Sequence, residues 1–593
     1  MRSTKMELRA GGAATAVLIA VLAVGLTVAG QEADAEKAIG GLAFMDEVQI
    51  TVVNIDVFVR DREGNVVTGL SEEDFRLTQD GRERKLSHFA AYTQEVISDI
   101  MQQRDEAMPA VSPPGSGEGV EGVPDGKNSA ATAMRVQPVH LALYVDNENL
   151  RPIDRNRVLT QVRSFLREIM APHVQVMVVS AARSTRIVQD FTNDPKEIVD
   201  ALRSLRKLSG ARSSRDTQRG RLIHNLQAME DQAASGNRKN MAVQAIDVEG
   251  RIRNYGEEIT MELDYSMAAL REITISLAGL PGRKVFVHIS SGLPMVPARD
   301  LIAWYGEVFQ GRSILPMLAR FDRSRMYEAL ASAANAQGVT FYMIDASGVS
   351  GTAGSSAEYT RPVDPLAANL YVINHQQPLQ IMAERTGGRA ILDTNDITGG
   401  LKELRDDLFT YYSLGYTISS SGADTVHRVD VELPNHPAYR LVYRRTYVEK
   451  SLETTVQEAV LSGLMVTPDH NPMGLEISAG ATRPTGDDRW ILPIEVRFPI
   501  TSVALLPEGD EYVGRLALFI TNRNLAGRQA DVQRREFEIR MPLSDYETRR
   551  HESYVADLGL LMEAGTHKLV VGLLDPVTRQ SSYAALTRAV PGD

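Results

Sequence analysis

The stretch LAGLPGRKVFVHISSGLP, from Leu277 to Pro294, decides the fold that we expect for this chain. A helix is predicted to end around Gly279 to Gly282, and a buried strand from Val285 to Ile289 then runs into a Ser-Ser-Gly loop. A doubly wound sheet presents its binding sites in this way, at the carboxyl ends of its strands. The stretch therefore predicts one strand of such a sheet, with its polar loop at the binding edge.

The same unit of buried strand and amphipathic helix recurs along the chain. Further apolar runs are found at Val139 to Val145, Val174 to Ala181, Val339 to Ile344 and, more briefly, Ala390 to Leu392. Asp194 before Pro195 predicts the first turn of one intervening helix. Strands that are apolar on both faces and alternate with helices indicate a parallel sheet covered on both sides. The predicted fold class is α/β, with a Rossmann-like, doubly wound and mostly parallel sheet.

A chain of 593 residues is too long to fold around a single hydrophobic core, so several domains are expected. Alternation of period two predicts a small β module over 45–95, and a composition rich in Pro, Gly and Ser predicts a disordered linker over 100–136. The α/β domain is assigned to 137–448, with antiparallel edge strands near its end. A series of alternating runs over 470–593 predicts an immunoglobulin-like β-sandwich.

Residues 208–265 are predicted to form an insertion in the α/β domain. The segment is rich in Arg, Gln, Glu and Asn, permits helix, and has few apolar repeats. Charged helical runs of this kind are usually exposed, so a solvated helical hairpin or lid is expected. The alternative is an arm that docks a partner.

Residues 1–35 are typical of an export signal. Arg2, Lys5 and Arg9 precede an uncharged apolar run from Ala13 to Ala29, and small residues follow. An uncleaved membrane anchor is the alternative, because the run is close to the shortest length that spans a bilayer. In either case the protein is expected to be exported to the periplasm, the cell surface or the medium. The absence of cysteine excludes disulfides and thiolate metal sites, and a net charge of −12 argues against a nucleic-acid partner.

Five segments together resemble a known family. They are DVFVRDREGNVVTGLSEEDFRLTQDGRERKLSHF, LAGLPGRKVFVHISSGLP, FYMIDASG, TGGRAILDTNDI and YYSLGYT, and they occur in the expected order within residues 45–448. This combination is similar to the von Willebrand factor type A-related domain family of Acidobacteria and similar bacteria. The resemblance implies an exported protein with a Rossmann-like type A domain used for binding other proteins.

Type A domains often hold a divalent cation through an Asp-x-Ser-x-Ser loop, a Thr and a further Asp. The positions that match these elements, in that order, are Asp146, Glu148, Leu150, Thr192 and Ser290 or Ser291. Leucine cannot ligate a metal, and serine replaces a carboxylate that Mg²⁺ or Ca²⁺ favours. The resemblance therefore implies a degenerate metal site, with Asp146, Glu148 and Thr192 as the candidate ligands of Mg or Ca.

Polar residues at several predicted strand ends form the candidate binding site. They are Asp146, Asn147, Glu148, Ser290, Ser291 and Asp345. The carboxyl ends of parallel strands meet at one edge, so these side chains could converge on one cleft. The alternative is that Asp146 and Asp345 cap helices or accept hydrogen bonds from loop amides.

The expected function is that of an exported, non-catalytic binding or scaffold protein with an unidentified protein partner. No Gly-x-Ser-x-Gly elbow, His-Glu-x-x-His helix or phosphate-binding Gly-Lys-Ser or Gly-Lys-Thr loop is present in the sequence. The alternative is a secreted hydrolase that uses the loop at Ser290 and Ser291. Strand alternation places His288 on the same face as Ser290, which is the basis of that hypothesis.

Overall fold

The computed structural model describes residues 50–107, 136–182, 185–208, 210, 212–236, 241–310, 312–349, 363–419, 422–486, 489–525 and 527–591. These residues belong to one compact unit, Gln49–Asp593. The expected signal at 1–35, and residues 108–135 of the expected linker, lie outside the described residues. Residues 100–107 of that linker are helical and belong to α1 (Gln94–Ala107), because proline and glycine enter the sequence after them.

A six-stranded sheet forms the centre of the α/β part. Its strands, in spatial order, are β10 (Ala390–Ile391), β9 (Val339–Asp345), β8 (Arg283–Ser290), β5 (Val139–Asp146), β6 (Val174–Ala181) and β7 (Thr185–Thr192). Neighbouring strands are parallel except β7, which pairs antiparallel with β6 at the edge. Counted from β5 in chain order, this is the 3-2-1-4-5-6 order of a doubly wound sheet.

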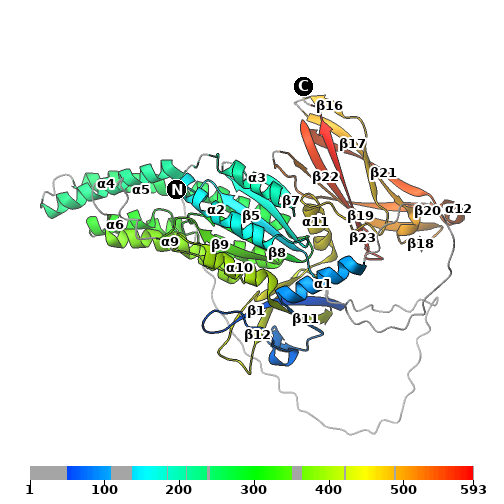
Figure 1. The fold of residues 1–593 in the computed structure, drawn as a ribbon. Coiled ribbons are helices and arrows are strands. Elements are labelled where there is room, and N and C mark those ends of the chain that lie inside the picture. The colour runs from blue at the N-terminus through cyan, green and yellow to red at the C-terminus, as the bar shows by residue number, and fades with distance from the viewer. Residues whose placement is uncertain are drawn as a thin grey trace, which may run out of the picture. The chain divides into compact units, whose positions relative to one another are not determined.

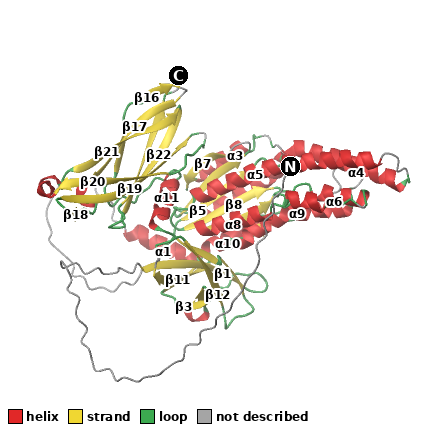
Figure 2. Ribbon diagram, turned by 180° about the vertical axis from the view of Figure 1, so that it is seen from behind, coloured by secondary structure: helices red, strands yellow, loops and turns green. Residues whose placement is uncertain are grey.

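Helices cover both faces of this sheet, because its strands are apolar on both sides (Figure 2). One face packs against α2 (Pro152–Ile169), α3 (Pro195–Leu205) and α10 (Thr398–Phe409). The other face packs against α5 (Met241–Ser276), α8 (Ser324–Gln337) and α9 (Pro365–Arg385). The predicted cap of α3 is confirmed, since the Asp194 carboxylate accepts a hydrogen bond from the Lys196 amide at 2.7 Å.

The insertion forms a helical layer with a core of its own. Helix α4 (Arg212–Ala234) and the first half of α5 lie side by side (Figure 1) and pack against α6 (Arg299–Val308) and α7 (Leu315–Phe321). The insertion was expected to be a solvated helical hairpin or lid, yet Ile223 and Ile252 are almost completely buried in this core, which also contains Trp304 of α6. Its apolar residues do follow helical spacing, but the charged residues between them hide the pattern.

The expected β module at 45–95 is not a separate unit. Its strands pair with those at 411–449, which were expected to be edge strands of the α/β domain. One sheet has the order β13 (Arg440–Tyr443), β1 (Ile50–Arg60), β11 (Tyr411–Ser419) and β4 (His88–Tyr92). The other has the order β14 (Thr446–Glu449), β12 (Thr425–Glu432), β2 (Arg76–Gln79) and β3 (Arg82–Arg84). Strands this short need a second apolar layer, and the two sheets share one core.

The C-terminal part contains two antiparallel sheets around a common core. The first consists of β15 (Glu476–Ala479), β16 (Arg483–Gly486), β17 (Arg489–Pro499) and β21 (Ser553–Glu563). The second consists of β18 (Leu506–Glu508), β19 (Glu511–Asn524), β20 (Gln533–Pro542), β22 (Gly565–Leu574) and β23 (Ser581–Val590). Two further helices are α11 (Leu452–Gly463), which packs on the second sheet, and α12 (Tyr546–Arg549). Strand alternation predicted this arrangement of antiparallel strands.

None of the helices within the described ranges combines the length and the apolar character that a membrane span requires.

The turn Thr386-Gly387-Gly388 gives a test of packing around the central sheet. A Cβ atom on Gly388 would overlap the carbonyl oxygen of Phe341 in β9, whereas one on Gly399 would meet no heavy atom within 4 Å. We expect Gly388→Ala to lower the free energy of unfolding by about 1–3 kcal/mol, because backbone atoms must shift. Gly399→Ala, in α10, should leave it unchanged or slightly raised. Urea denaturation of both variants checks this, and equal midpoints would contradict it.

Candidate functional site

The ends of β5 and β8 bring two of the predicted site residues into direct contact. The Ser290 hydroxyl donates a hydrogen bond to Oδ2 of Asp146 at 3.1 Å, and both side chains are buried. Asp345, at the end of β9, lies opposite Ser290 in the parallel register. Asp146, Ser290 and Asp345 therefore lie along one edge of the sheet, as strand order predicts.

Asp146 is committed to hydrogen bonds inside its own loop. Its Oδ1 accepts from the Asn149 amide at 3.2 Å, its Oδ2 accepts from the Asn149 side chain at 2.7 Å, and Nε2 of His288 lies 3.7 Å from Oδ2. Burial acts to raise the pKa of Asp146, but interaction with His288 and Asn149 outweighs it, so this pKa lies below its ordinary value. The carboxylate is thus an ionised acceptor held by protein donors.

The other predicted binding residues also have protein partners. Asp345 accepts hydrogen bonds from the amide and hydroxyl of Ser347 and from the Gln376 side chain, the last at 3.0 Å. The side-chain oxygen of Asn147 accepts from Arg155 at 2.8 Å. Ser347 lies two residues beyond Asp345, so the loop-amide alternative describes Asp345 well. Ser291 is buried, and its hydroxyl has no hydrogen-bond partner among the described residues.

Thr192 lies at the edge of the sheet where the parallel strands begin, far from Asp146. Its prediction as a metal ligand is therefore wrong. Asp146 is opposite Ala181 in β6, whereas Thr192 is opposite Val176. Val176 and Ala181 are five residues apart in β6, which corresponds to about 16 Å along the strand. Because β7 runs antiparallel to β6, the carboxyl end of β7, where Thr192 lies, is beside the beginning of β6. The Thr192 hydroxyl accepts a hydrogen bond from the Asp194 amide.

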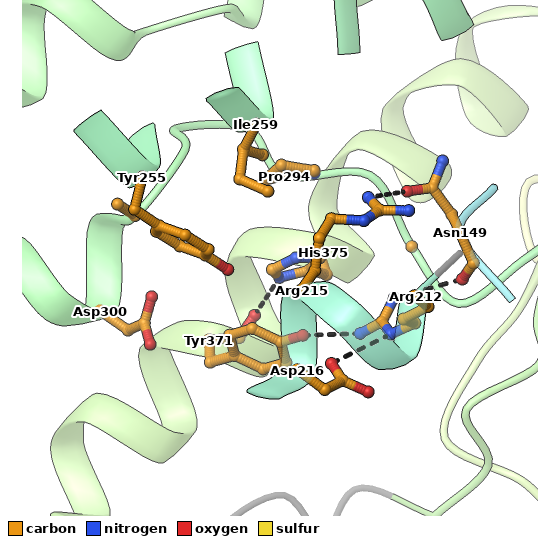
Figure 3. Close-up of a pocket in the computed structure, with 12 residues that line it drawn as sticks. Asn149, Arg212, Arg215, Asp216, Tyr255, Ile259, Pro294, Asp300, Tyr371 and His375 are labelled. Atoms are coloured by element: carbon orange, nitrogen blue, oxygen red, sulfur yellow. Dashed lines mark hydrogen bonds and ion pairs between the residues drawn. The ribbon is translucent and has the colours of Figure 1, made fainter. Parts of the chain in front are cut away.

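Two arginines of α4 donate hydrogen bonds to Asn149 in the loop after β5 (Figure 3), and sequence reasoning missed both. Arg212, which is 7% exposed, donates to the carbonyl oxygens of Asn149 and Ser291 at 3.3 and 3.2 Å. It also donates to the Tyr371 hydroxyl at 2.6 Å. Arg215 donates to the Asn149 side chain at 2.7 Å and to the carbonyl oxygen of Glu148. The spacing of Arg212, Arg215 and Arg219 on one helix face was the available signal.

Below these arginines lies a cavity of about 30 Å³, lined in part by Tyr255, Tyr371 and His375 (Figure 3). Burial, with the charges of Arg212 and Arg219 nearby, lowers the pKa of His375 to about 3. Its ring is therefore neutral at physiological pH. A volume of this size holds about one water molecule, so the cavity is part of a packed polar network.

The residues of the Asp146 loop do not fit a divalent cation. Mg²⁺ and Ca²⁺ require several free oxygen ligands, but the Asp146 oxygens already accept hydrogen bonds from Asn149 and Ser290. Two guanidinium groups donate to carbonyl oxygens of the same loop, and their positive charge would repel a cation. Within the described ranges, no group of three or more His, Cys, Asp or Glu side chains is arranged to hold a metal ion.

A larger cavity, of about 580 Å³, opens beside the same loop. The end of β5, the start of β7 and one face of α5 line it, and Glu148 and Arg215 belong to both the loop network and this cavity. This volume lies within the range of sites that bind ligands or side chains. Glu148 is thus a predicted site residue that lines this cavity.

The hydrolase hypothesis depends on Ser290 or Ser291. The hydroxyl of Ser290 donates to Asp146, and both nitrogens of His288 lack a hydrogen-bond partner among the described residues. A general base must lie within hydrogen-bond reach of its nucleophile. Neither serine lines either of the two cavities described above.

Comparisons with known proteins do not assign this chain to a family. No model of a protein family matches the chain, and no curated protein matches it. Among solved structures, an aerotolerance-related membrane protein from Bacteroides fragilis is 13% identical, with 46% of this chain and 98% of that chain covered, at a TM-score of 0.23. BatB from Bacteroides thetaiotaomicron is 11% identical, with 46% and 97% covered, at a TM-score of 0.22. The vWF domain of a type V pili tip protein from Porphyromonas gingivalis is 12% identical, with 46% and 95% covered, at a TM-score of 0.23.

Arg212 should be essential to the stability of this edge. Arg212→Met removes a buried charge and leaves two carbonyl oxygens and the Tyr371 hydroxyl without their donor. We expect the free energy of unfolding to fall by about 3 kcal/mol. The matched control is Arg203→Met, because the Arg203 side chain is 66% exposed in its ion pair with Asp200 and should matter little. Equal melting temperatures for the two variants would contradict the assignment.

The lowered pKa of Asp146 gives a pH dependence with a defined sign. A folded-state pKa below the unfolded one stabilises the fold above the unfolded value, about 3.9, and this contribution is lost as the pH falls through the folded pKa. Asp146→Asn should therefore be less stable than the parent protein at pH 7, and the difference should narrow toward pH 3. Melting temperatures across that range check this, and a constant difference would refute it.

Proposed function

We propose that this chain is an exported, non-catalytic binding protein that recognises a partner protein at the carboxyl edge of its α/β sheet. In this proposal the α/β part is a type A-like domain, and arginines of α4 occupy the place of the divalent cation in its degenerate metal loop. The cavity of about 580 Å³ beside that loop is the observation that carries the proposal.

Three features support a binding role at this edge. The strand order of the central sheet is that of doubly wound folds, which bind ligands at the carboxyl ends of their strands. The helical layer that follows β6 and β7 in sequence covers this edge and supplies one wall of the cavity. Ser290, the alternative nucleophile, is buried and hydrogen-bonded to Asp146, which favours binding over hydrolysis. Export rests on the composition of residues 1–35.

Selection from a library of random peptides displayed on phage tests this function with the full chain. We expect peptides to be enriched that bind equally well in EDTA and in millimolar Mg²⁺, because no metal bridges the contact. Ala269→Trp fills the cavity from α5 and should weaken their binding by at least about tenfold.

The matched control is Val243→Trp, on the same helix at a position that is 69% exposed and outside the cavity. It should bind the enriched peptides as the parent chain does. Failure to enrich any peptide, or equal affinity for Ala269→Trp and the parent chain, would overturn the proposed function.

A further inference from the structure

One face of α5 presents acidic and small residues to the larger cavity. Glu258, Glu262 and Glu272 lie on this face, with Ala268 and Ala269 between them. The spacing of four and ten residues keeps the three glutamates on one side of a helix. Small side chains at the centre leave the groove open, so carboxylates border an apolar floor.

The described residues that line the cavity carry more negative than positive charge. They include four carboxylates, those of Glu148, Glu258, Glu262 and Glu272, and one guanidinium, that of Arg215. Arg215 lies 3.1 Å from Glu262, so it offsets part of this charge. Burial raises the pKa of Glu272 and of Glu262, although Arg215 acts against it at Glu262. Burial removes water from these carboxylates, and the nearby protein cations do not fully compensate for it. Such a site favours a cationic ligand.

The Tyr144 hydroxyl independently points to a hydrogen-bonding ligand in this cavity. The residue is 1% exposed, it lines the cavity, and its hydroxyl forms no hydrogen bond of normal geometry with a described residue. The Thr185 hydroxyl is close enough to affect the pKa of Tyr144, which burial raises well above its ordinary value. A buried hydroxyl without a partner costs free energy, and an N–H donor in the cavity would remove that cost.

We propose that this cavity binds the basic side chain, arginine or lysine, of the partner protein. The cation would lie beside Glu272 and donate to the Tyr144 hydroxyl. Glu262, about 15 Å away along α5, and Glu148 near it add negative charge at the other end of the cavity. Its alkyl stem would lie on the alanines of α5, and the exposed ring of Tyr265 at the mouth offers a face for a cation–π contact. The inference rests on the proposed function and specifies the chemistry that this edge recognises.

Isothermal titration of the full chain with N-acetyl-arginine amide and N-acetyl-lysine amide tests this site. Each probe has one side chain, so we expect saturable binding with a Kd on the order of 1 mM. N-acetyl-citrulline amide has nearly the shape of the arginine probe but no charge, and it should bind at least about tenfold more weakly. Equal binding of the arginine and citrulline probes would overturn the proposal.

Substitutions in the cavity locate the probe. Glu272→Gln removes one charge with little change of shape and should raise the Kd about fivefold to tenfold. The matched control is Asp264→Asn, on the same helix, whose side chain is 54% exposed and outside the cavity. It should leave the Kd unchanged, and a similar loss in both variants would show a general charge effect and refute the site.

Tyr144→Phe separates a ligand contact from a structural role. It removes a hydroxyl that forms no hydrogen bond of normal geometry with a described residue, so the melting temperature of the free chain should not fall. The Kd for the probe should nevertheless rise about threefold or more. A lower melting temperature with an unchanged Kd would assign the hydroxyl a structural role and overturn its part in binding.

The two proposals fail in different ways. If peptides are enriched and Ala269→Trp blocks them, but neither basic probe binds, the proposed function stands and the cation site is wrong. If a probe binds and Glu272→Gln weakens it, but no peptide is enriched, the cavity recognises a basic group without a protein partner, and the proposed function is wrong.

Discussion

The buried guanidinium of Arg212 is the interaction on which the carboxyl edge of the sheet depends. It connects three parts of the chain: the loop after β5 through Asn149, the loop after β8 through Ser291, and α9 through Tyr371. Backbone carbonyls and a hydroxyl accept hydrogen bonds from its two terminal nitrogens, and Asp216 lies 3.6 Å from Nε and balances its charge. Removing such a group leaves every partner unsatisfied in a low dielectric. The helical layer is therefore held to the sheet by polar contacts as well as by its own core.

In this arrangement the protein itself supplies positive charge to the loop after β5. A divalent cation and a guanidinium both supply positive charge to loop oxygens, but each guanidinium here is part of helix α4. Helix α4 thus places α5 next to the sheet, and the space left between α5 and the ends of β5 and β6 is the acidic cavity. The loop is thus hydrogen-bonded to α4, and the cavity lies beside it.

The central sheet could be predicted from sequence because its signal is local. Val174 to Ala181 was predicted with its observed ends, since a continuous apolar run reports a strand buried on both faces. The β module could not be predicted, because alternation identifies strands without naming their partners. Ile55 in β1 pairs with Leu414 in β11, several hundred residues later, and nothing in either stretch specifies that pairing.

The site was predicted in part for the same reason. The positions of Asp146, Ser290 and Asp345 follow from the rule for parallel strand ends. The prediction for Thr192 was wrong because the sequence of β7 does not show that this strand runs antiparallel to β6. The arginines of α4 look like a solvated charge run in sequence, and their burial depends on an edge formed by distant strands. A buried charge at such an edge can be inferred only once its acceptors are placed. The segment that looks like a solvated charge run in sequence thus carries the arginines that bind the Asp146 loop and two of the four carboxylates found among the described residues that line the cavity.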